Sequence, residues 1–167
     1  MKLRNYQDDL IARARESLKT HNATLLVAAT GAGKTALTVH MMKRAAERGH
    51  SSIFCVHRDT LLSQTSKALW RQKVQHGIIA AGRTMSREMV QVASVQTLVR
   101  RLKQVPEPKL IIIDEAHRAA ANTYRKILEH YPNAKVIGLT ATPQRTDGKG
   151  LKDVFDELVL GPSVYGF

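Results

Sequence analysis

The sequence has one cysteine, few aromatic residues and no long apolar run, and each shortage excludes a class of protein. Cys55 alone permits no internal disulfide and no cysteine-based zinc site, so we interpret it as a small core residue. No run approaches the ~20 apolar residues of a membrane span. The N-terminus lacks the apolar core of a signal peptide. It also contains three acidic residues, Asp8, Asp9 and Glu16, whereas transit peptides contain few. We therefore expect a cytoplasmic protein with no membrane partner.

Acidic residues are also scarce. The 167-residue chain has 26 Lys and Arg against 14 Asp and Glu, a net charge of +12. From Arg58 to Lys109 there are ten basic and three acidic residues. Such an excess attracts polyanions, so nucleic acid is a candidate partner, and a solvated basic surface is the alternative. The length suits one domain with a sizeable core.

Apolar runs and helical patterns alternate along the chain. The spacing predicts helices over 5–19, 34–48 (ending at Gly49), 59–70, 96–104 and 122–131, with Asp59 or Thr60 as the N-cap of the third. Strands are predicted over 24–29, 51–56, 77–81, 90–95, 109–114 and 134–140. The last ten residues, "LVLGPSVYGF", show no clear element. This alternation favours an α/β fold, a mostly parallel sheet with helices on both faces.

The stretch "LLVAATGAGKT", from Leu25 to Thr35, ends an apolar strand in small residues and two glycines. A phosphate chain needs backbone N–H groups pointed at it, and a following helix offers its positive N-terminus. Lys34 can then reach the β- and γ-phosphates, and the Thr35 hydroxyl can hold Mg²⁺. Ala28 stands where the strict motif has its first glycine. The alternative reading is a tight strand-to-helix turn.

A second stretch, "LIIIDEAH", runs from Leu110 to His117 and delivers two carboxylates to the end of a strand. Ligands bind at that edge of open α/β sheets. Asp114 would hold Mg²⁺, through water, and Glu115 would orient or deprotonate an attacking water. A helix N-terminus with favourable charges is the alternative reading.

A third stretch, "GLTATP" from Gly138 to Pro143, is weak by itself, but the three together resemble superfamily two helicases and translocases. Residues 28–35, "DEAH" and "TATP" look like motifs I, II and III in the family's order. "VHRDTLLSQ" (56–64) and "ASVQTL" (93–98) are similar to motifs Ia and Ib, and "LRNYQ" (3–7) resembles the adenine-recognising segment. "LTATPQRTDGKGL" is closer to the DNA-handling branches, namely restriction-enzyme motor subunits, RadD-like repair proteins and phage helicases.

The resemblance implies a RecA-like fold, ATP and Mg²⁺ as cofactors, and a role for each matched residue. Lys34, Asp114 and Glu115 would be catalytic, and Thr35 with Asp114 would hold the metal. Nucleotide binding would involve Arg4, Tyr6, Gln7, Thr30, Gly31, Ala32, Gly33, Lys34 and Thr35. Coupling residues would be His117, Thr140 and Thr142. Contacts to nucleic acid, DNA rather than RNA, would come from Arg58, Gln96 and Thr97.

The resemblance also sets an expected domain organisation. Residues 1–167 would be one RecA-like ATP-binding domain, with an adenine-recognition region over 1–20 and a motor core over 24–143. Residues 144–167 would begin the connection to a second RecA-like domain of the same parent chain, which carries motifs IV to VI. Two other functions stay open on the sequence: a P-loop kinase or other metabolic ATPase, and a nucleic-acid-binding module without hydrolysis.

Overall fold

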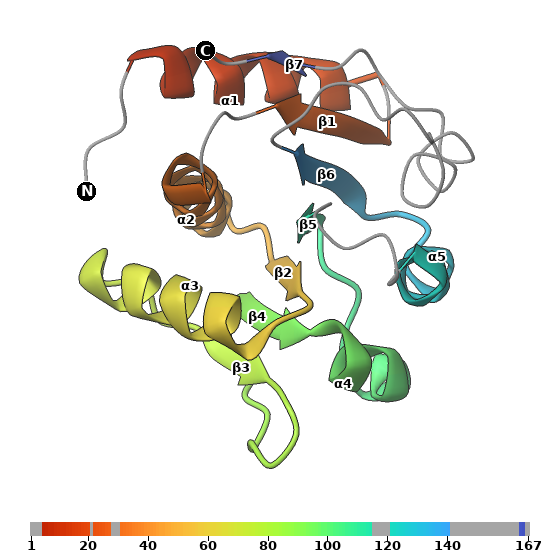
Figure 1. The fold of residues 1–167 in the computed structure, drawn as a ribbon. Coiled ribbons are helices and arrows are strands. Elements are labelled where there is room, and N and C mark those ends of the chain that lie inside the picture. The colour runs from red at the N-terminus through yellow and green to blue at the C-terminus, as the bar shows by residue number, and fades with distance from the viewer. Residues whose placement is uncertain (1–4, 21, 28–30, 115–120, 141–163, 166–167) are drawn as a thin grey trace.

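Seven strands form one sheet in the computed structural model, which describes residues 5–20, 22–27, 31–114, 121–140 and 164–165. The strands are β1 (Ala23–Val27), β2 (Ser52–Val56), β3 (Gly77–Ile79), β4 (Val90–Ser94), β5 (Leu110–Asp114), β6 (Lys135–Thr140) and β7 (Val164–Tyr165). Their order is β3-β4-β2-β5-β6-β1-β7, which Figure 1 shows from bottom to top. Each described pair of neighbours is parallel.

Helices cover both faces of this sheet. The helices α1 (Asn5–Leu18), α2 (Gly31–Glu47) and α3 (Asp59–Arg71) pack against one face, and α4 (Val95–Arg100) and α5 (Ala121–His130) against the other. In Figure 1, α2 and α3 lie to the left of the strands, and α4 and α5 to the right. A short 3-10 helix, Leu102–Gln104, follows α4. The prediction of a mostly parallel sheet with helices on both faces is confirmed.

The central strands are apolar on both faces because both faces are covered. In β5, Ile112 packs with the helices α1 to α3, whereas Ile111 and Ile113 pack with α4 and α5. Successive side chains of a strand point to opposite faces, so an uninterrupted apolar run is what this position requires. Cys55 is fully buried in β2, as expected from the sequence.

Four predictions about the elements were wrong. The helix predicted over 96–104 divides into α4, which ends at Arg100, and the 3-10 helix Leu102–Gln104. The N-cap of α3 is Arg58, which makes no side-chain cap hydrogen bond, so Asp59 is the first helical residue and not the cap. The helix α2 begins at Gly31, ahead of the predicted start at Lys34, since its glycines adopt helical backbone. The terminal stretch was expected to lack an element, yet β7 lies in it and pairs with β1. Two residues are too few to show a sequence pattern.

The end of α2 agrees with the prediction that Gly49 terminates it. Gly49 has a φ of +78°, and its N–H and that of His50 bond to the carbonyls of Ala46 and Ala45. This is the hydrogen-bonding pattern of a Schellman motif, which needs a residue with positive φ. Within the described residues, no helix is both long and apolar enough to cross a bilayer.

Candidate functional site

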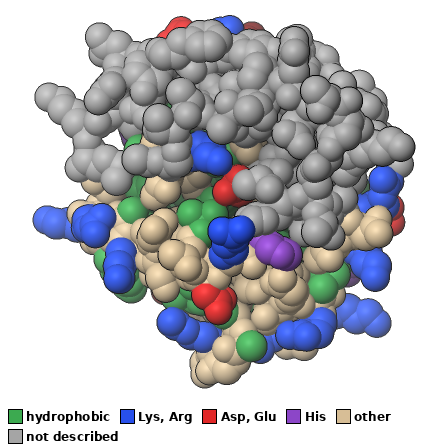
Figure 2. All heavy atoms as spheres, viewed as in Figure 1, with side chains coloured by type: hydrophobic (Ala, Val, Ile, Leu, Met, Phe, Trp, Pro, Cys, Tyr) green, Lys and Arg blue, Asp and Glu red, His purple; other side chains and the backbone are tan. Residues whose placement is uncertain are grey.

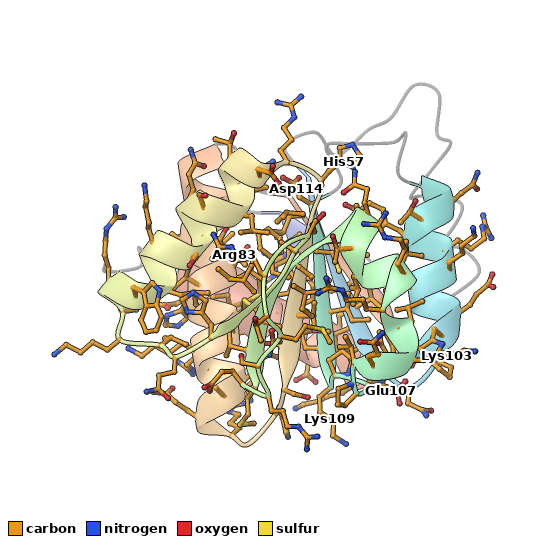
Figure 3. The ribbon with its side chains drawn as sticks, turned by 90° about the horizontal axis from the view of Figure 1, so that it is seen from below. His57, Arg83, Lys103, Glu107, Lys109 and Asp114 are labelled. Carbon is orange, nitrogen blue, oxygen red and sulfur yellow. The ribbon has the colours of Figure 1, made fainter. Side chains whose placement is uncertain are left out.

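The carboxyl ends of three adjacent strands meet at one edge of the sheet. Val27, the last residue of β1, is in register with Thr140 of β6, and Leu139 is in register with Asp114 of β5. The chain leaves β1 at Val27 and enters α2 at Gly31. The first turn of α2 therefore lies at the same edge as Asp114, which Figure 3 labels at that end of the sheet.

Lys34 and Asp114 form an ion pair across this edge. Lys34 Nζ is 3.5 Å from Asp114 Oδ1, and their side chains are 17% and 13% exposed. Lys34 lies in the first turn of α2, and its side chain is largely covered. The first N–H groups of a helix have no partner within the helix, so this turn offers donors and positive potential to an anion. Thr38 Oγ1 donates to the Lys34 carbonyl at 2.9 Å and steadies the turn.

A cavity of about 710 Å³ opens beside this ion pair. Its lining includes Lys34, Thr35 and Asp114, and three polar side chains of α3 that sequence reasoning missed: Gln64, Lys67 and Arg71. These three follow one another at steps of three and four residues, so helical spacing places them on one face and could have identified them. Apolar side chains complete the lining: Phe54, Leu61, Ala68 and Leu139.

The electrostatics of this face favour an anion. Lys34, Lys67 and Arg71 line the cavity, and among the described lining residues Asp114 is the single carboxylate. Figure 2 views the molecule as in Figure 1, and Lys and Arg outnumber Asp and Glu among the described side chains in view. A phosphate group would meet cations, helix N–H donors and few competing carboxylates.

The donor set also fits a magnesium ion held together with phosphates. A threonine hydroxyl and a carboxylate are hard oxygen ligands, which Mg²⁺ prefers, and Thr35 and Asp114 both line the cavity. Among the described residues, no group of three or more His, Cys, Asp or Glu side chains could hold a metal by itself. Mg²⁺ commonly binds through one or two protein oxygens plus substrate phosphates, so this pair is sufficient.

Only part of the predicted nucleotide site is described. Gly31, Ala32 and Gly33 form the start of α2, where their N–H groups belong to its first turn. Tyr6 and Gln7 belong to α1, Thr140 ends β6, and for these three only the backbone is described. Arg4, Thr30, Glu115, His117 and Thr142 lie outside the described residues.

The residues predicted to contact nucleic acid fall on two neighbouring segments. Gln96 Nε2 lies 3.4 Å from His57 Nδ1, which joins the start of α4 to the segment that follows β2. Arg58, next to His57, and Gln96 are exposed, whereas Thr97 is 3% exposed. The side chain of Thr97 is therefore not available at the surface that Arg58 and Gln96 reach. Figure 3 shows His57 at the same end of the sheet as Asp114.

Comparison with known proteins agrees with this geometry. Residues 1–145 match the family described as "Type III restriction enzyme, res subunit". A 51.5 kDa protein of a Lactococcus phage is 36% identical over 134 residues, which cover 80% of this chain and 27% of that protein. The Type I restriction enzyme EcoAI endonuclease subunit of Escherichia coli is 30% identical over 171 residues, covering 93% of this chain and 21% of the relative.

A solved structure gives the same result for the fold. The helicase domain of Hef from Pyrococcus furiosus superposes with a TM-score of 0.77 at 27% identity, and the match covers 98% of this chain and 37% of that one. This chain thus spans less than a third of the two curated relatives and 37% of the helicase structure. The chain belongs to the family described as "Type III restriction enzyme, res subunit" and has the fold of a superfamily two helicase motor domain.

Proposed function

We propose that this domain binds Mg-ATP at the Lys34–Asp114 edge and, within a longer protein, couples ATP hydrolysis to movement on DNA. One observation carries the nucleotide half of the proposal. The ion pair joins the first turn of α2 to the end of β5, so a cation for phosphate and a carboxylate for metal meet at 3.5 Å. Neither residue type alone would indicate more than a turn or a helix cap.

Each residue of this edge has a distinct task in the proposal. The N–H groups of Gly31, Ala32 and Gly33 would cradle the phosphates, with Thr30 completing the loop. Lys34 would move from Asp114 to the β- and γ-phosphates, where a charge-assisted hydrogen bond is strong. Thr35 and Asp114 would hold Mg²⁺. The bound metal would neutralise the negative charge that develops on the phosphate oxygens.

Hydrolysis also needs a side chain that activates the attacking water. Glu115 follows Asp114 directly in the sequence, and we assign it the task of orienting the attacking water or accepting its proton. The adenine would be read by Gln7 with Arg4 or Tyr6, near the start of α1. His117, Thr140 and Thr142 would transmit the state of the nucleotide to bound nucleic acid. These assignments rest on the motif resemblance.

The DNA half of the proposal draws on the basic middle segment and on the family. Arg58 and Gln96 are both exposed, and His57, which precedes Arg58, contacts Gln96, so neighbouring segments offer a cation and an amide to a phosphate backbone. The family description and the EcoAI relative both name restriction enzymes, and this favours DNA over RNA. We keep Thr97 as a residue that supports α4.

A second RecA-like domain completes the proposal. Residues 1–167 would form the first domain, with residues 1–20 at the adenine, 24–143 as the motor core and 144–167 leading onward. The nucleotide would then be enclosed between the two domains, and an arginine from the second would stabilise the transition state. Such an arginine contributes roughly 10³–10⁵ in rate. The fraction of each relative that this chain spans supports this organisation.

The experiment compares the longer parent protein with residues 1–167 alone. We expect single-stranded DNA to stimulate ATP hydrolysis by the parent, and Glu115→Gln to abolish hydrolysis while sparing ATP binding. Glu129→Gln, an exposed carboxylate on α5, is the matched control and should leave the rate unchanged. Residues 1–167 alone should hydrolyse ATP barely above background.

Two outcomes would reject parts of the proposal. Turnover by the isolated 167 residues at about 1 s⁻¹ or faster, typical of complete enzymes, would remove the need for a second domain. A parent protein that binds DNA but hydrolyses no ATP would instead be a binding module. A kinase would transfer phosphate to an acceptor other than water without a DNA requirement, and the family match does not favour it.

A further inference from the structure

A second cavity, which we call the basic pocket, lies at the opposite end of the sheet from Asp114. It has a volume of about 160 Å³ and lies between α1, α2 and the first residues of β5 and β6. Lys109, which precedes β5, lines it, whereas Asp114 ends that strand. Figure 3 shows Lys109 and Asp114 at opposite ends of the sheet. Five residue steps along a strand span ~16 Å, so the basic pocket is separate from the candidate nucleotide site.

The charged residues around this basic pocket are all of one sign. Among the described residues, its lining holds five Lys and Arg side chains and His50 but no Asp or Glu; the five are Arg15, Arg44, Arg48, Lys109 and Lys135. Lys135 Nζ donates to Asn22 Oδ1 at 3.2 Å. Among the described residues, the other four make no ion pair within 4.0 Å. Desolvation, followed by repulsion from Arg48 and Arg44, lowers the pKa of Arg15.

The partial negative charges at two helix C-termini balance only part of the positive charge of this cluster. Arg15 and Arg44 lie in the last turns of α1 and α2, where cations are favourable. A helix C-terminus carries the equivalent of roughly half a negative charge, so two termini offset about one cation. For the remaining positive charge of Arg15, Arg44, Arg48 and Lys109, the described lining offers no carboxylate. A site for an external anion accounts for the excess.

The floor of the pocket is apolar, which favours an anion that also carries an apolar group. Ile11, Ala14, Met41 and Ile137 line it and are 7%, 0%, 5% and 3% exposed. An apolar cavity of ~150 Å³ is large enough for a benzene ring, so this volume suits one aromatic or branched aliphatic side chain. Inorganic phosphate would satisfy the cations and leave this floor unfilled.

We infer that the basic pocket binds an acidic protein segment that inserts one apolar side chain between α1 and α2. Carboxylates of the segment would pair with the guanidinium groups of Arg44 and Arg48, whose planar donors match a carboxylate. Single-stranded nucleic acid fits less well. Proteins bind its bases by stacking on aromatic side chains, and the part of the lining that the structure describes includes no Phe, Tyr or Trp.

The test uses a short fluorescein-labelled peptide in which aspartates flank a Leu-Phe pair, measured by fluorescence anisotropy against the 167-residue chain. We expect binding that weakens on the order of tenfold or more in the double variant Arg44→Glu, Arg48→Glu, because reversed charges oppose the carboxylates. Lys109→Glu should weaken it independently. The matched control, Arg100→Glu with Lys103→Glu, changes the net charge equally at exposed residues of another segment and should change affinity less than about twofold.

Two further probes separate the occupants. Replacing the Leu-Phe pair of the peptide by Gly-Gly keeps its charge and should reduce binding to the level of the double variant. Oligothymidylate of equal charge should bind this pocket more weakly than the peptide. The inference is wrong if the peptide does not bind, or if its affinity is unchanged by the protein variants and by the Gly-Gly replacement. Tighter oligothymidylate binding that the double variant removes would also overturn it and assign the pocket to nucleic acid. Circular dichroism melts and ATP affinity check that each variant is folded.

Discussion

Gln96 and His57 are in contact although 39 residues separate them: Gln96 Nε2 lies 3.4 Å from His57 Nδ1. Ser94 Oγ donates to Gln96 Oε1 at 3.0 Å, so both ends of the Gln96 amide are engaged. The amide N–H can donate to Nδ1 in the tautomer of His57 that carries its proton on Nε2. The contact brings the exposed Arg58 beside the start of α4, and the two segments resembling motifs Ia and Ib become neighbours.

Arg58→Ala should weaken the binding of single-stranded DNA to a similar extent for every sequence. Arg58 is exposed next to this contact, and phosphate neutralisation carries no sequence information. The slope of log affinity against log salt should fall by about one unit or less. Fluorescence anisotropy with oligothymidylate and a mixed-sequence strand, at several salt concentrations, measures both effects. Arg87→Ala, an exposed arginine of the segment between β3 and β4, is the control. Salt-insensitive binding would contradict this prediction.

Lys34→Ala should lower the affinity for ATP and ADP about tenfold or more. The variant loses a charge-assisted hydrogen bond to phosphate worth roughly 1.5–3 kcal/mol. Because the Lys34 side chain is already paired with Asp114, part of its phosphate contact is offset by the loss of that ion pair. Titration of a fluorescent ADP analogue measures the change. Lys43→Ala removes a lysine elsewhere on α2 and should leave affinity unchanged. Equal affinities for the two variants would reject Lys34 as a phosphate ligand.

Lys67→Ala and Arg71→Ala should each weaken ATP binding by less than Lys34→Ala does. Both side chains line the cavity beside Lys34 but extend from α3, so they add positive potential and are not built into the first turn of α2. An exposed charge interaction contributes roughly 0.2–1 kcal/mol, which corresponds to a change of about fivefold at most. The same titration, repeated in high salt, should reduce these two effects more than that of Lys34→Ala. Lys73→Ala, just beyond α3, serves as the control.

Cys55 should make the stability of the fold depend on pH above about 9. Burial raises the pKa of the Cys55 thiol from 9.0 to about 12. The unfolded chain therefore loses this proton at lower pH than the folded chain, so the stabilisation is complete below pH 9 and is lost as the pH rises towards 12. Between pH 9 and pH 10 the free energy of unfolding should fall by about 1 kcal/mol more in the natural chain than in Cys55→Ala.

Urea denaturation at the two pH values measures this difference. The comparison with Cys55→Ala removes the contribution of Tyr131, whose pKa burial also raises to about 12. The alanine variant creates a small cavity and lowers stability at both pH values, so the prediction concerns the change with pH and not the absolute value. Parallel pH dependence in the two proteins would show that the thiol ionises equally in the folded and unfolded chains.

The order and type of the elements follow from local properties of the sequence. Six of the strands and the five helices correspond to predicted segments, because burial on both faces leaves uninterrupted apolar runs such as "LIIID", and helix faces repeat near every fourth residue. Gly49 was predicted correctly to end α2, whereas the glycines before Lys34, which were expected in a loop, lie in the first turn of that helix. Lys34, Thr35 and Asp114 were also identified from the sequence as candidate site residues, because they follow or end predicted strands.

The distances between these residues were decided by the tertiary structure. Lys34 and Asp114 are 80 residues apart, and only the parallel register that places β1, β6 and β5 side by side brings them to 3.5 Å. The same packing turns Gln64, Lys67 and Arg71 toward the cavity and gathers cations from α1, from α2 and the residue after it, from the residue before β5 and from β6 around the basic pocket. Local patterns show which face of an element is buried. They carry no information on which elements become neighbours, because strand order and helix packing depend on contacts between residues far apart in the sequence.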